Sequence, residues 1–421
     1  MKYTETAIDL DQRDPLKNFR AQFYIPQYQG NDMAYFCGNS LGLQPIKTKD
    51  YILQELNDWA EHGVEGHFKA KNPWLTYHEM FAEPLSKLVG SKTSEVVCMN
   101  QLTVNLNLLM SSFYRPTAKR FKIICEAKAF PSDQYAFALQ AQYHGFSPDD
   151  AIVEVHPREG EFAIRISDII QTIENEGESV ALVLFSGVNY YTGQLFDMQA
   201  ITQVAHRAGA YCGFDLAHAI GNVSLSLHDW DADFATWCSY KYLNSGPGGV
   251  SGIYVHERFH GVEGFPAFAG WWGHDKETRF KMDKIFVPIH SAEAWQMSNA
   301  PVFSMAAHKA SLNIFMDADF EKLQSKRKAL HSFLRTGLAD LPNTMKQRFT
   351  IITPENQDEH GCQVSLLFSE KGKAIFDFLS QKGIVADWRE PNVIRVAPVP
   401  LYNSFNDIAR LLEALATFDN L

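Results

Sequence analysis

The sequence predicts an α/β fold with a mostly parallel sheet sandwiched by helices, followed by a smaller α+β domain. The chain has 421 residues, 46% of them hydrophobic, which is enough for a sizeable core and two domains. Between residues 151 and 214, short apolar runs alternate with segments of helical periodicity, as in parallel strands joined by helices. After about residue 305 the pattern changes to longer helices and separate strands. We therefore expect an N-terminal arm and helix (1–65), a large α/β domain (66–304) and a small α+β domain (305–421).

The individual elements follow in order along the chain. An irregular arm is expected to precede a helix over 46–60, where apolar residues recur at helical spacing, and residues 65–74 are expected to form a loop. Another helix is expected to begin near Gln101, and a Pro-containing turn to follow Phe130. The large domain has predicted strands at 95–99, 121–126, 151–155, 180–185, 210–214 and 234–238, and predicted helices at 167–175 and 198–208. The small domain has predicted helices at 320–341, 372–382 and from 406, and predicted strands near 349–353, 362–368 and 393–396.

Charge and composition argue against several classes of protein. The net charge of -11 and the pI near 5.8 argue against a nucleic-acid partner, which would require a basic face. No apolar run is long enough to span a membrane, and the polar start over residues 1–13 lacks the apolar core of a signal peptide. We therefore expect a cytoplasmic protein. The six cysteines form no CxxC pair and the histidines no HExxH motif, so we expect free buried thiols and no metal site.

An acid, an imidazole and an amine are predicted to lie at two neighbouring strand ends. Asp215 and His218 follow the apolar run 210–214, and Lys241 follows the run 234–238. Ligands of α/β enzymes bind at such strand ends. Aromatic neighbours would partly desolvate Lys241, which favours a neutral amine that can attack a carbonyl. Pyridoxal phosphate (PLP) chemistry needs such a lysine, and it needs a carboxylate that keeps the ring nitrogen protonated. Taken singly, each of the three residues also has an ordinary structural interpretation.

Further segments have features of a phosphate and ring site. Thr103 lies in the first turn of a helix, where its hydroxyl and free backbone N–H groups can bind a phosphate, although capping alone would explain it. Phe130 can offer a flat face to a heteroaromatic ring, or can belong to the core. Ser186 stands at a strand end, and the glycine-rich turn 244–249 lets the backbone approach Lys241. This turn lacks the GKS/T ending of a Walker loop.

Arg395 stands inside the otherwise apolar strand 393–396. A guanidinium in such a place must find an anion, and its planar fork suits the α-carboxylate of an amino-acid substrate. A structural ion pair within the protein is the alternative interpretation.

Several of these segments together resemble the kynureninase family, a group of aminotransferase-like (fold type I) PLP enzymes with a seven-stranded sheet. The resemblance runs from residues 38–42 to residues 401–405, with the matching stretches in the same order. The specific stretches are Leu102-Thr103-Val104-Asn105, Phe130-Pro131-Ser132-Asp133, Phe214-Asp215-Leu216-Ala217-His218, Ser239-Tyr240-Lys241-Tyr242-Leu243-Asn244, Gly270-Trp271 to His274, and Arg395-Val396-Ala397-Pro398.

The resemblance implies a role for each matching residue. Lys241 would bind PLP covalently, Asp215 would pair with the pyridinium nitrogen, and Phe130 would stack on the ring. Tyr240 would bind the phosphate or protonate the substrate's Cβ. The other implied cofactor neighbours are Leu102, Thr103, Pro131, Ser132, Asp133, Ser186 and His218, together with Trp271 and Asn299 from the partner subunit of a homodimer. The implied substrate-binding residues are Ser40, His67, Asn299 and Arg395.

The resemblance also implies a reaction. It is the PLP-dependent hydrolysis of the Cβ–Cγ bond of L-kynurenine or 3-hydroxy-L-kynurenine, which gives anthranilate or 3-hydroxyanthranilate plus L-alanine in tryptophan catabolism, the kynurenine pathway towards NAD biosynthesis. His67 and Asn299 would favour the 3-hydroxy substrate, because both side chains can hydrogen-bond its ring hydroxyl.

Two alternatives remain open at this point. Another fold type I enzyme, such as a cysteine desulfurase or an aminotransferase, would share Asp215, His218 and Lys241. A desulfurase needs a reactive cysteine, whereas Cys362 begins an apolar strand, where thiols are usually inert. A non-catalytic scaffold protein would have no need for Lys241 or Arg395.

Overall fold

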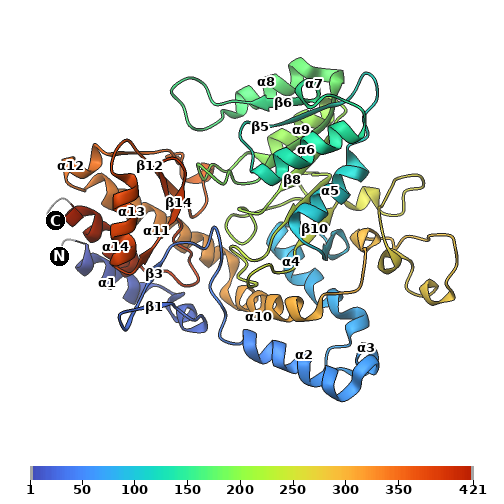
Figure 1. Ribbon diagram of the computed structural model, residues 1–421, viewed down its shortest axis with the longest axis horizontal. Helices are drawn as coiled ribbons and strands as arrows, with labels where there is room; N and C mark the ends of the chain where they lie inside the picture. The colour runs from blue at the N-terminus through green and yellow to red at the C-terminus, as the bar shows by residue number, and fades with distance from the viewer. Residues whose placement is uncertain (1–2, 419–421) are drawn as a thin grey trace.

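A seven-stranded sheet with the strand order β4-β10-β9-β8-β7-β5-β6 forms the centre of the large domain. The structure, a computed structural model, describes residues 3–418, and Figure 1 shows this sheet among its helices with the small domain to one side. The strands are β4 (Val96–Cys98), β5 (Lys122–Glu126), β6 (Ile152–Val155), β7 (Val180–Ser186), β8 (Tyr211–Asp215), β9 (Phe234–Trp237) and β10 (Gly252–Val255). Strands β6, β5, β7, β8 and β9 are parallel, and β10 is antiparallel to both β9 and β4. The predicted mostly parallel α/β sheet is therefore confirmed.

Helices cover both faces of this sheet because successive strand residues point to opposite sides. Ile124 of β5 belongs to one core, which includes Ile169 of α8 (Ile166–Glu176) and residues of α9 (Met198–Arg207) and α4 (Ala82–Val89). Its neighbour Ile123 belongs to the other core, which includes Leu109 of α5 (Leu102–Phe113) and Phe137 of α6 (Pro131–Tyr143). A further short helix, α7 (Pro148–Ala151), leads into β6. The alternation seen in the sequence thus reflects burial on two sides.

The small domain has a four-stranded sheet with the order β11-β12-β15-β14, and all of its pairs are antiparallel. These strands are β11 (Phe349–Ile351), β12 (Val364–Phe368), β14 (Asp387–Arg389) and β15 (Val393–Val396). The helices around it are α11 (Phe320–Ala339), α12 (Asn343–Lys346), α13 (Gly372–Gln381) and α14 (Phe405–Thr417). The predicted α+β character of this part is confirmed.

The N-terminal segment packs on the small domain. Helix α1 (Thr4–Arg13) lies along α14, where the carboxylate of Asp11 accepts the backbone N–H groups of Phe405 at 2.7 Å and Asn406 at 3.0 Å. Strand β3 (Ala34–Tyr35) pairs in parallel with β13 (Ile384–Val385), and a short hairpin, β1 (Gln27–Tyr28) with β2 (Asn31–Asp32), precedes it. The two ends of the described chain therefore lie on the same side of the molecule, as Figure 1 shows.

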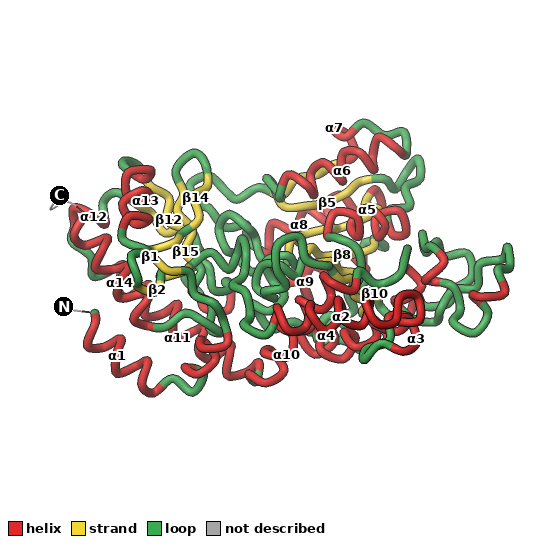
Figure 2. The backbone as a smooth tube through the Cα atoms, turned by 60° about the horizontal axis from the view of Figure 1, so that its bottom comes forward, coloured by secondary structure: helices red, strands yellow, loops and turns green. Residues whose placement is uncertain are grey.

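Helix α10 (Val302–Ala318) leads from the large domain to the small one. Its residues Met305, Leu312 and Phe315 belong to the core of the large domain, and α2 (Thr48–His62) packs along it. Figures 1 and 2 both show α2 and α10 next to each other beneath the sheet. Helix α10 spans residue 305, the point at which the sequence analysis places the domain boundary.

Three local predictions were wrong. The expected irregular arm contains α1, because packing against α14 and the hydrogen bonds of Asp11 to that helix stabilise a helix there. The expected loop at 65–74 contains the short helix α3 (Gly66–Lys69). The turn expected after Phe130 is the start of α6, since Pro131 is the first helical residue, where a missing N–H costs nothing.

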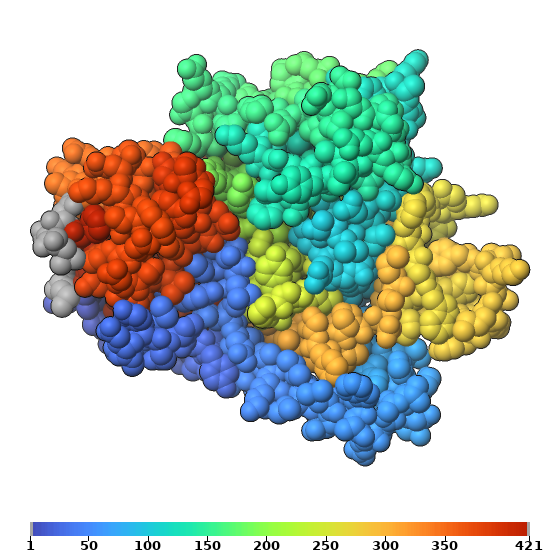
Figure 3. Space-filling model, viewed as in Figure 1, coloured from blue at the N-terminus to red at the C-terminus, as the bar shows by residue number. Residues whose placement is uncertain are grey.

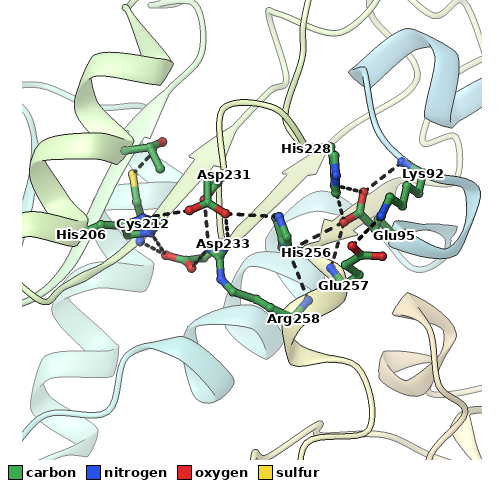
Figure 4. Close-up of polar contacts among 11 residues, drawn as sticks. Lys92, Glu95, His206, Cys212, His228, Asp231, Asp233, His256, Glu257 and Arg258 are labelled. Carbon is green, nitrogen blue, oxygen red and sulfur yellow. Dashed lines mark hydrogen bonds and ion pairs between the residues drawn. The ribbon is translucent and has the colours of Figure 1, made fainter.

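A polar network joins the edge of the sheet at which the parallel strands begin (Figure 4). The buried Glu95 accepts hydrogen bonds from two backbone N–H groups and from Nδ1 of His228, all at 2.9 Å. The rings of His228 and His256 stack with their centroids 5.0 Å apart. Next along this edge, the buried Asp233 pairs with Arg258. These contacts hold β4, β9 and β10 together.

Candidate active site

One cavity at the carboxyl ends of β8 and β9 brings together residues from five distant parts of the sequence. The predicted site residues that line it are Leu102, Thr103, Phe130, Ser132, Asp133, Ser186, Asp215, His218, Tyr240 and Lys241. The glycine-rich turn after Lys241 lines it too, through Gly248 and Gly249. In Figure 3 the residues around this turn are yellow-green. They lie in a hollow between the blue N-terminal segments and the cyan surface of the large domain.

Lys241 and His218 form the centre of the cavity. The Nζ of Lys241 lies 3.0 Å from Nε2 of His218. Burial lowers the pKa of His218 well below its ordinary value, and the positive charge of Lys241 acts in the same direction. The imidazole is therefore neutral and accepts a hydrogen bond from the amine. Its other nitrogen, Nδ1, has no hydrogen-bond partner among residues 3–418.

Two aspartates face this amine. Oδ1 of Asp215 accepts the backbone N–H of Ala217 at 2.7 Å. Burial raises the pKa of Asp215, and the nearby charge of Lys241 opposes that shift. Burial also raises the pKa of Asp133 well above its ordinary value, and the charge of Asp215 raises it further. The upward shift of the pKa is larger for Asp133 than for Asp215, so within this pair Asp133 binds a proton more readily.

The amine of Lys241 also lies between two aromatic rings. It is 5.8 Å from the ring centroid of Phe130 and 5.9 Å from that of Tyr240. Burial raises the pKa of the Tyr240 phenol, so that its hydroxyl remains a hydrogen-bond donor. Phe130 in turn packs edge-on against Tyr190, with the centroids 5.2 Å apart. Phe130 is therefore held with part of its ring exposed to the cavity, and is not an ordinary core residue.

The first turn of α5 lines one end of the cavity. Gln101 is the N-cap residue, and its side chain makes no capping hydrogen bond. The alternative interpretation of Thr103 as a capping residue has no such hydrogen bond to support it in the described structure. The N–H groups of Leu102 and Thr103 have no partner within the helix and lie at the positive end of its dipole. Such a helix start binds phosphate.

Gly42 allows another segment to approach Lys241 closely. Its N–H donates to the carbonyl oxygen of Tyr240 at 2.8 Å. A Cβ at this position would overlap the carbonyl oxygen of Lys241, so only glycine fits. The predicted turn at 38–42 thereby buttresses the backbone of the lysine.

The cavity has the groups that PLP requires. It has an amine beside a neutral imidazole, a carboxyl group for a ring nitrogen, an aromatic face and an uncapped helix start for a phosphate. Oδ1 of Asp133 and Nδ1 of His218 are buried there without a partner in the described part of the chain, which is the state expected of atoms that contact a bound group. The residues present therefore fit this cofactor.

Comparisons with known proteins agree with this fit. Residues 323–415 match the family model of the kynureninase C-terminal domain. The kynureninase of Flavobacterium psychrophilum is 55% identical over 404 residues, which cover 96% of this chain and 95% of that protein. The kynureninase of Myxococcus xanthus is 50% identical (97% and 96% covered), and that of Nematostella vectensis 45% identical (98% and 93% covered). The chain belongs to the kynureninase family.

Solved structures with low sequence identity share the fold of this kynureninase-family chain. A C-DES mutant with glycine covalently linked to its PLP cofactor has a TM-score of 0.76 at 17% identity, with 91% of this chain and 96% of that one covered. An apo cysteine desulfurase from Thermococcus onnurineus NA1 has a TM-score of 0.76 at 16% identity, with 98% of both chains covered. These likenesses confirm the predicted fold type I architecture, and the kynureninase family accounts for PLP as the cofactor.

Arg395 lies directly behind the wall of the cavity. It is fully buried in β15, and its guanidinium meets the carboxylate of Asp387 with two contacts, Nε to Oδ1 at 3.1 Å and Nη2 to Oδ2 at 2.9 Å. Nη1 donates to the carbonyl oxygen of Tyr190 at 2.5 Å, and Tyr190 itself lines the cavity. The ion pair of the structural interpretation is thus present, at a place next to the site.

The remaining predicted site residues do not line the cavity of their own chain. His67 lies on α3, where its Nδ1 is 2.9 Å from the carbonyl oxygen of Val64. Trp271 is exposed, and its Nε1 donates to the carbonyl oxygen of Arg279. Asn299 lines a neighbouring cavity that shares Gln101, Val104 and Gly248 with the main one. Ser40 lies in the turn that supports Lys241, and Pro131 starts α6.

Sequence reasoning missed Glu126, which lines the cavity at the end of β5. A carboxylate at the end of an apolar strand was the available signal.

Reasoning from motifs also missed two groups of metal-ligand type that the fold assembles. One contains Glu95, His228 and His256, and the other contains His78, Glu79 and Glu293. In the first group Glu95 and His228 hydrogen-bond to each other, and in the second Lys276 forms ion pairs with both glutamates.

Proposed function

We propose that this chain acts as a kynureninase: a PLP-dependent hydrolase that cleaves the Cβ–Cγ bond of L-kynurenine or 3-hydroxy-L-kynurenine to give anthranilate or 3-hydroxyanthranilate plus L-alanine. Family membership over nearly the whole chain supports this function. The structural observation that carries it is the position of Lys241, whose amine meets a neutral His218 between two aromatic rings, with the carboxyl group of Asp215 nearby.

Lys241 and Asp215 have the central roles in this proposal. When bound, PLP supplies an electron sink for the carbanion that forms at the substrate's Cα. Lys241 would hold the cofactor covalently through Nζ, and, once the substrate has displaced it, the same amine would take the Cα proton. The neutral Nε2 of His218 keeps this amine in place. The carboxylate of Asp215 would hold a proton on the ring nitrogen, and the larger upward shift in the pKa of Asp133 favours a single negative charge in this acid pair.

The other end of the cavity would bind the cofactor phosphate. The backbone N–H groups at the start of α5 and the Thr103 hydroxyl are donors for its oxygens. The Tyr240 hydroxyl is a further donor, and because burial keeps it protonated it could also deliver a proton to Cβ after the bond breaks. Phe130 would lie against the ring.

For the substrate, the guanidinium of Arg395 would bind the α-carboxylate once the guanidinium turns from Asp387 toward the cavity.

We further propose that the enzyme is a homodimer with shared sites. Large apolar side chains are exposed on α2, on α3 and on the segment 268–287, among them Trp59, Phe68, Met282 and Ile285. Exposed patches of this kind mark protein contacts. In a dimer this face would be covered, and His67, Trp271 and Asn299 would reach the partner's cavity.

No helix among residues 3–418 is long and apolar enough to cross a membrane. We propose a cytoplasmic location.

The desulfurase alternative has no support beyond the shared fold. Cys362 is buried, and burial raises the pKa of its thiol to about 12, which leaves it unreactive at neutral pH.

The function can be tested directly with the purified protein reconstituted with PLP. We expect stoichiometric release of anthranilate, followed by its fluorescence, and of L-alanine, followed with a coupled dehydrogenase, from L-kynurenine. A protein that binds PLP and releases neither product, or that instead releases sulfide from cysteine, would overturn the proposal.

A further inference from the structure

Glu126 is a buried acid in the wall of the active-site cavity. It is the last residue of β5, and only 2% of its surface is exposed. Its carboxylate accepts two groups of a single neighbour: the hydroxyl of Ser186 donates to Oε1 at 2.5 Å, and the backbone N–H of Ser186 lies 3.2 Å from Oε1 and 3.1 Å from Oε2. The carboxylate therefore holds both the side chain and the backbone of Ser186.

Ser186 occupies a defined place in the cavity. It ends β7, directly opposite Asp215 of β8 in the register of the sheet, and both residues line the cavity. The neighbouring N–H of Gly187 donates to the carbonyl oxygen of Asp215 at 2.7 Å. A shift of Ser186 would consequently displace Asp215, the acid that faces Lys241.

The hydrogen bonds also fix how the Ser186 hydroxyl is oriented. A hydroxyl has one proton and two lone pairs. While Glu126 is ionised, the hydroxyl proton points to it and the lone pairs are directed away from it, so that the hydroxyl acts as an acceptor toward any other group. Burial raises the pKa of Glu126 to about 7, and the donors of Ser186 act against that shift. The hydrogen bonds from Ser186 thus favour the ionised form of Glu126, which is the form that accepts them.

We propose that Glu126 is a positioning residue for the cofactor, which acts through Ser186 by holding its hydroxyl as a hydrogen-bond acceptor at the cavity wall next to Asp215. This inference rests on PLP being the cofactor of this cavity. Glu126 does not itself touch the reacting atoms in this proposal. Its removal would leave the Ser186 hydroxyl free to rotate and the β7 end free to move, so that bound PLP would be held less tightly and less uniformly.

The test compares the dissociation constant of PLP and the visible circular dichroism of bound PLP in four variants. Glu126→Ala should weaken PLP binding by about tenfold, the typical cost of a charge-assisted hydrogen bond, and should reduce the dichroism per bound cofactor. Glu126→Gln keeps one oxygen acceptor for Ser186, so this variant should retain most of the PLP affinity and most of the dichroism. Ser186→Ala should weaken binding to a similar extent, and the double variant Glu126→Ala/Ser186→Ala should be no worse than Ser186→Ala alone.

Glu154→Ala is the matched control. Glu154 stands beside Cys125 in the register of β5 and β6, is exposed and does not line the cavity, so this variant should bind PLP like the wild type. Additive losses in the double variant, or a Glu126→Ala protein with unchanged affinity and dichroism, would overturn the inference. If Glu126→Ala does not fold, Glu126→Gln decides the same question. It should weaken PLP binding a few-fold when Ser186 is present, and it should cause no further loss when it is added to Ser186→Ala. A wild-type protein that does not bind PLP would instead refute the proposed function.

Discussion

The Nζ of Lys241 lies 3.0 Å from Nε2 of His218, although the two residues come from the ends of different strands, β9 and β8. Burial keeps the imidazole neutral and its pKa low, so it can accept a hydrogen bond but does not repel the lysine. The pair therefore holds the amine at one point between the rings of Phe130 and Tyr240. The chemistry proposed for the site depends on this position.

Replacement of Lys241 by alanine should abolish turnover and leave the fold intact. Lys241 is half-buried, and no other amine lines the cavity among the described residues, so nothing replaces it as cofactor anchor and as base for the Cα proton. Steady-state production of L-alanine from kynurenine measures turnover, and a thermal melt checks the fold. Sustained alanine production by the purified variant would show that Lys241 is not the essential amine.

Arg395→Lys should raise KM for kynurenine by about tenfold or more and leave the absorbance of bound PLP nearly unchanged, since lysine is a point charge that cannot make the two-pronged contact. The matched control is Arg389→Lys: Arg389 contacts the same Asp387, with Nε at 3.1 Å from Oδ1, but its side chain is 36% exposed. This control should have the KM of the wild type. If Arg395→Lys instead unfolds or loses the PLP absorbance, the ion pair with Asp387 is structural and Arg395 does not bind substrate.

We expect a higher kcat/KM for 3-hydroxykynurenine than for kynurenine, by roughly tenfold to a hundredfold, because an unpaired buried polar group costs about 1–3 kcal/mol. His67 and Asn299, which are both proposed to reach the cavity of the partner subunit, carry this prediction. His67 is only partly buried and packs edge-on against Trp74, with the centroids 5.5 Å apart, so its replacement should not disturb the core.

The two substrates should be compared on the wild type and on His67→Phe, in which the ratio should narrow. His62→Phe, at the end of α2, is the control and should keep the ratio of the wild type. Equal kcat/KM values for the two substrates in the wild-type enzyme would show that these side chains do not read the hydroxyl.

His308→Leu should stabilise the protein more at pH 5 than at pH 8. His308 is fully buried in α10 against Phe81, and neither ring nitrogen has a partner among residues 3–418. Burial lowers its pKa from 6.5 to about 3. Between these two values the unfolded state binds a proton that the folded state does not, so this histidine reduces stability progressively as the pH falls below 6.5.

The increase in the unfolding free energy caused by His308→Leu should be about 2 kcal/mol larger at pH 5 than at pH 8. Urea unfolding at the two pH values measures it. Other buried histidines, such as His331 and His360, titrate equally in both proteins and cancel in the comparison. The same difference in unfolding free energy at both pH values would contradict the prediction.

The sequence predicted most of the large-domain fold because its signals are local. Alternation of apolar runs and helical periods placed β5, β7, β8, α8 and α9 close to their observed bounds, and strand ends placed Asp215 and Lys241 at one edge of the sheet. Helix α1 was missed because its stability comes from α14, almost the whole chain away, and β10 was missed because four buried residues carry no periodicity of their own.

The sequence by itself determined which chemical groups the site contains: an amine, acids, an imidazole, aromatic rings and a helix start, each with a recognisable local context. Only the tertiary structure decided which of them meet. The pairing of Lys241 with His218, the hydrogen bonds of Glu126 with Ser186 and the ion pair of Arg395 with Asp387 join separate strands or the segments that follow them. Their energies depend on burial and on distances of about 3 Å, and neither quantity exists in the chain until the two sheets are packed against their helices.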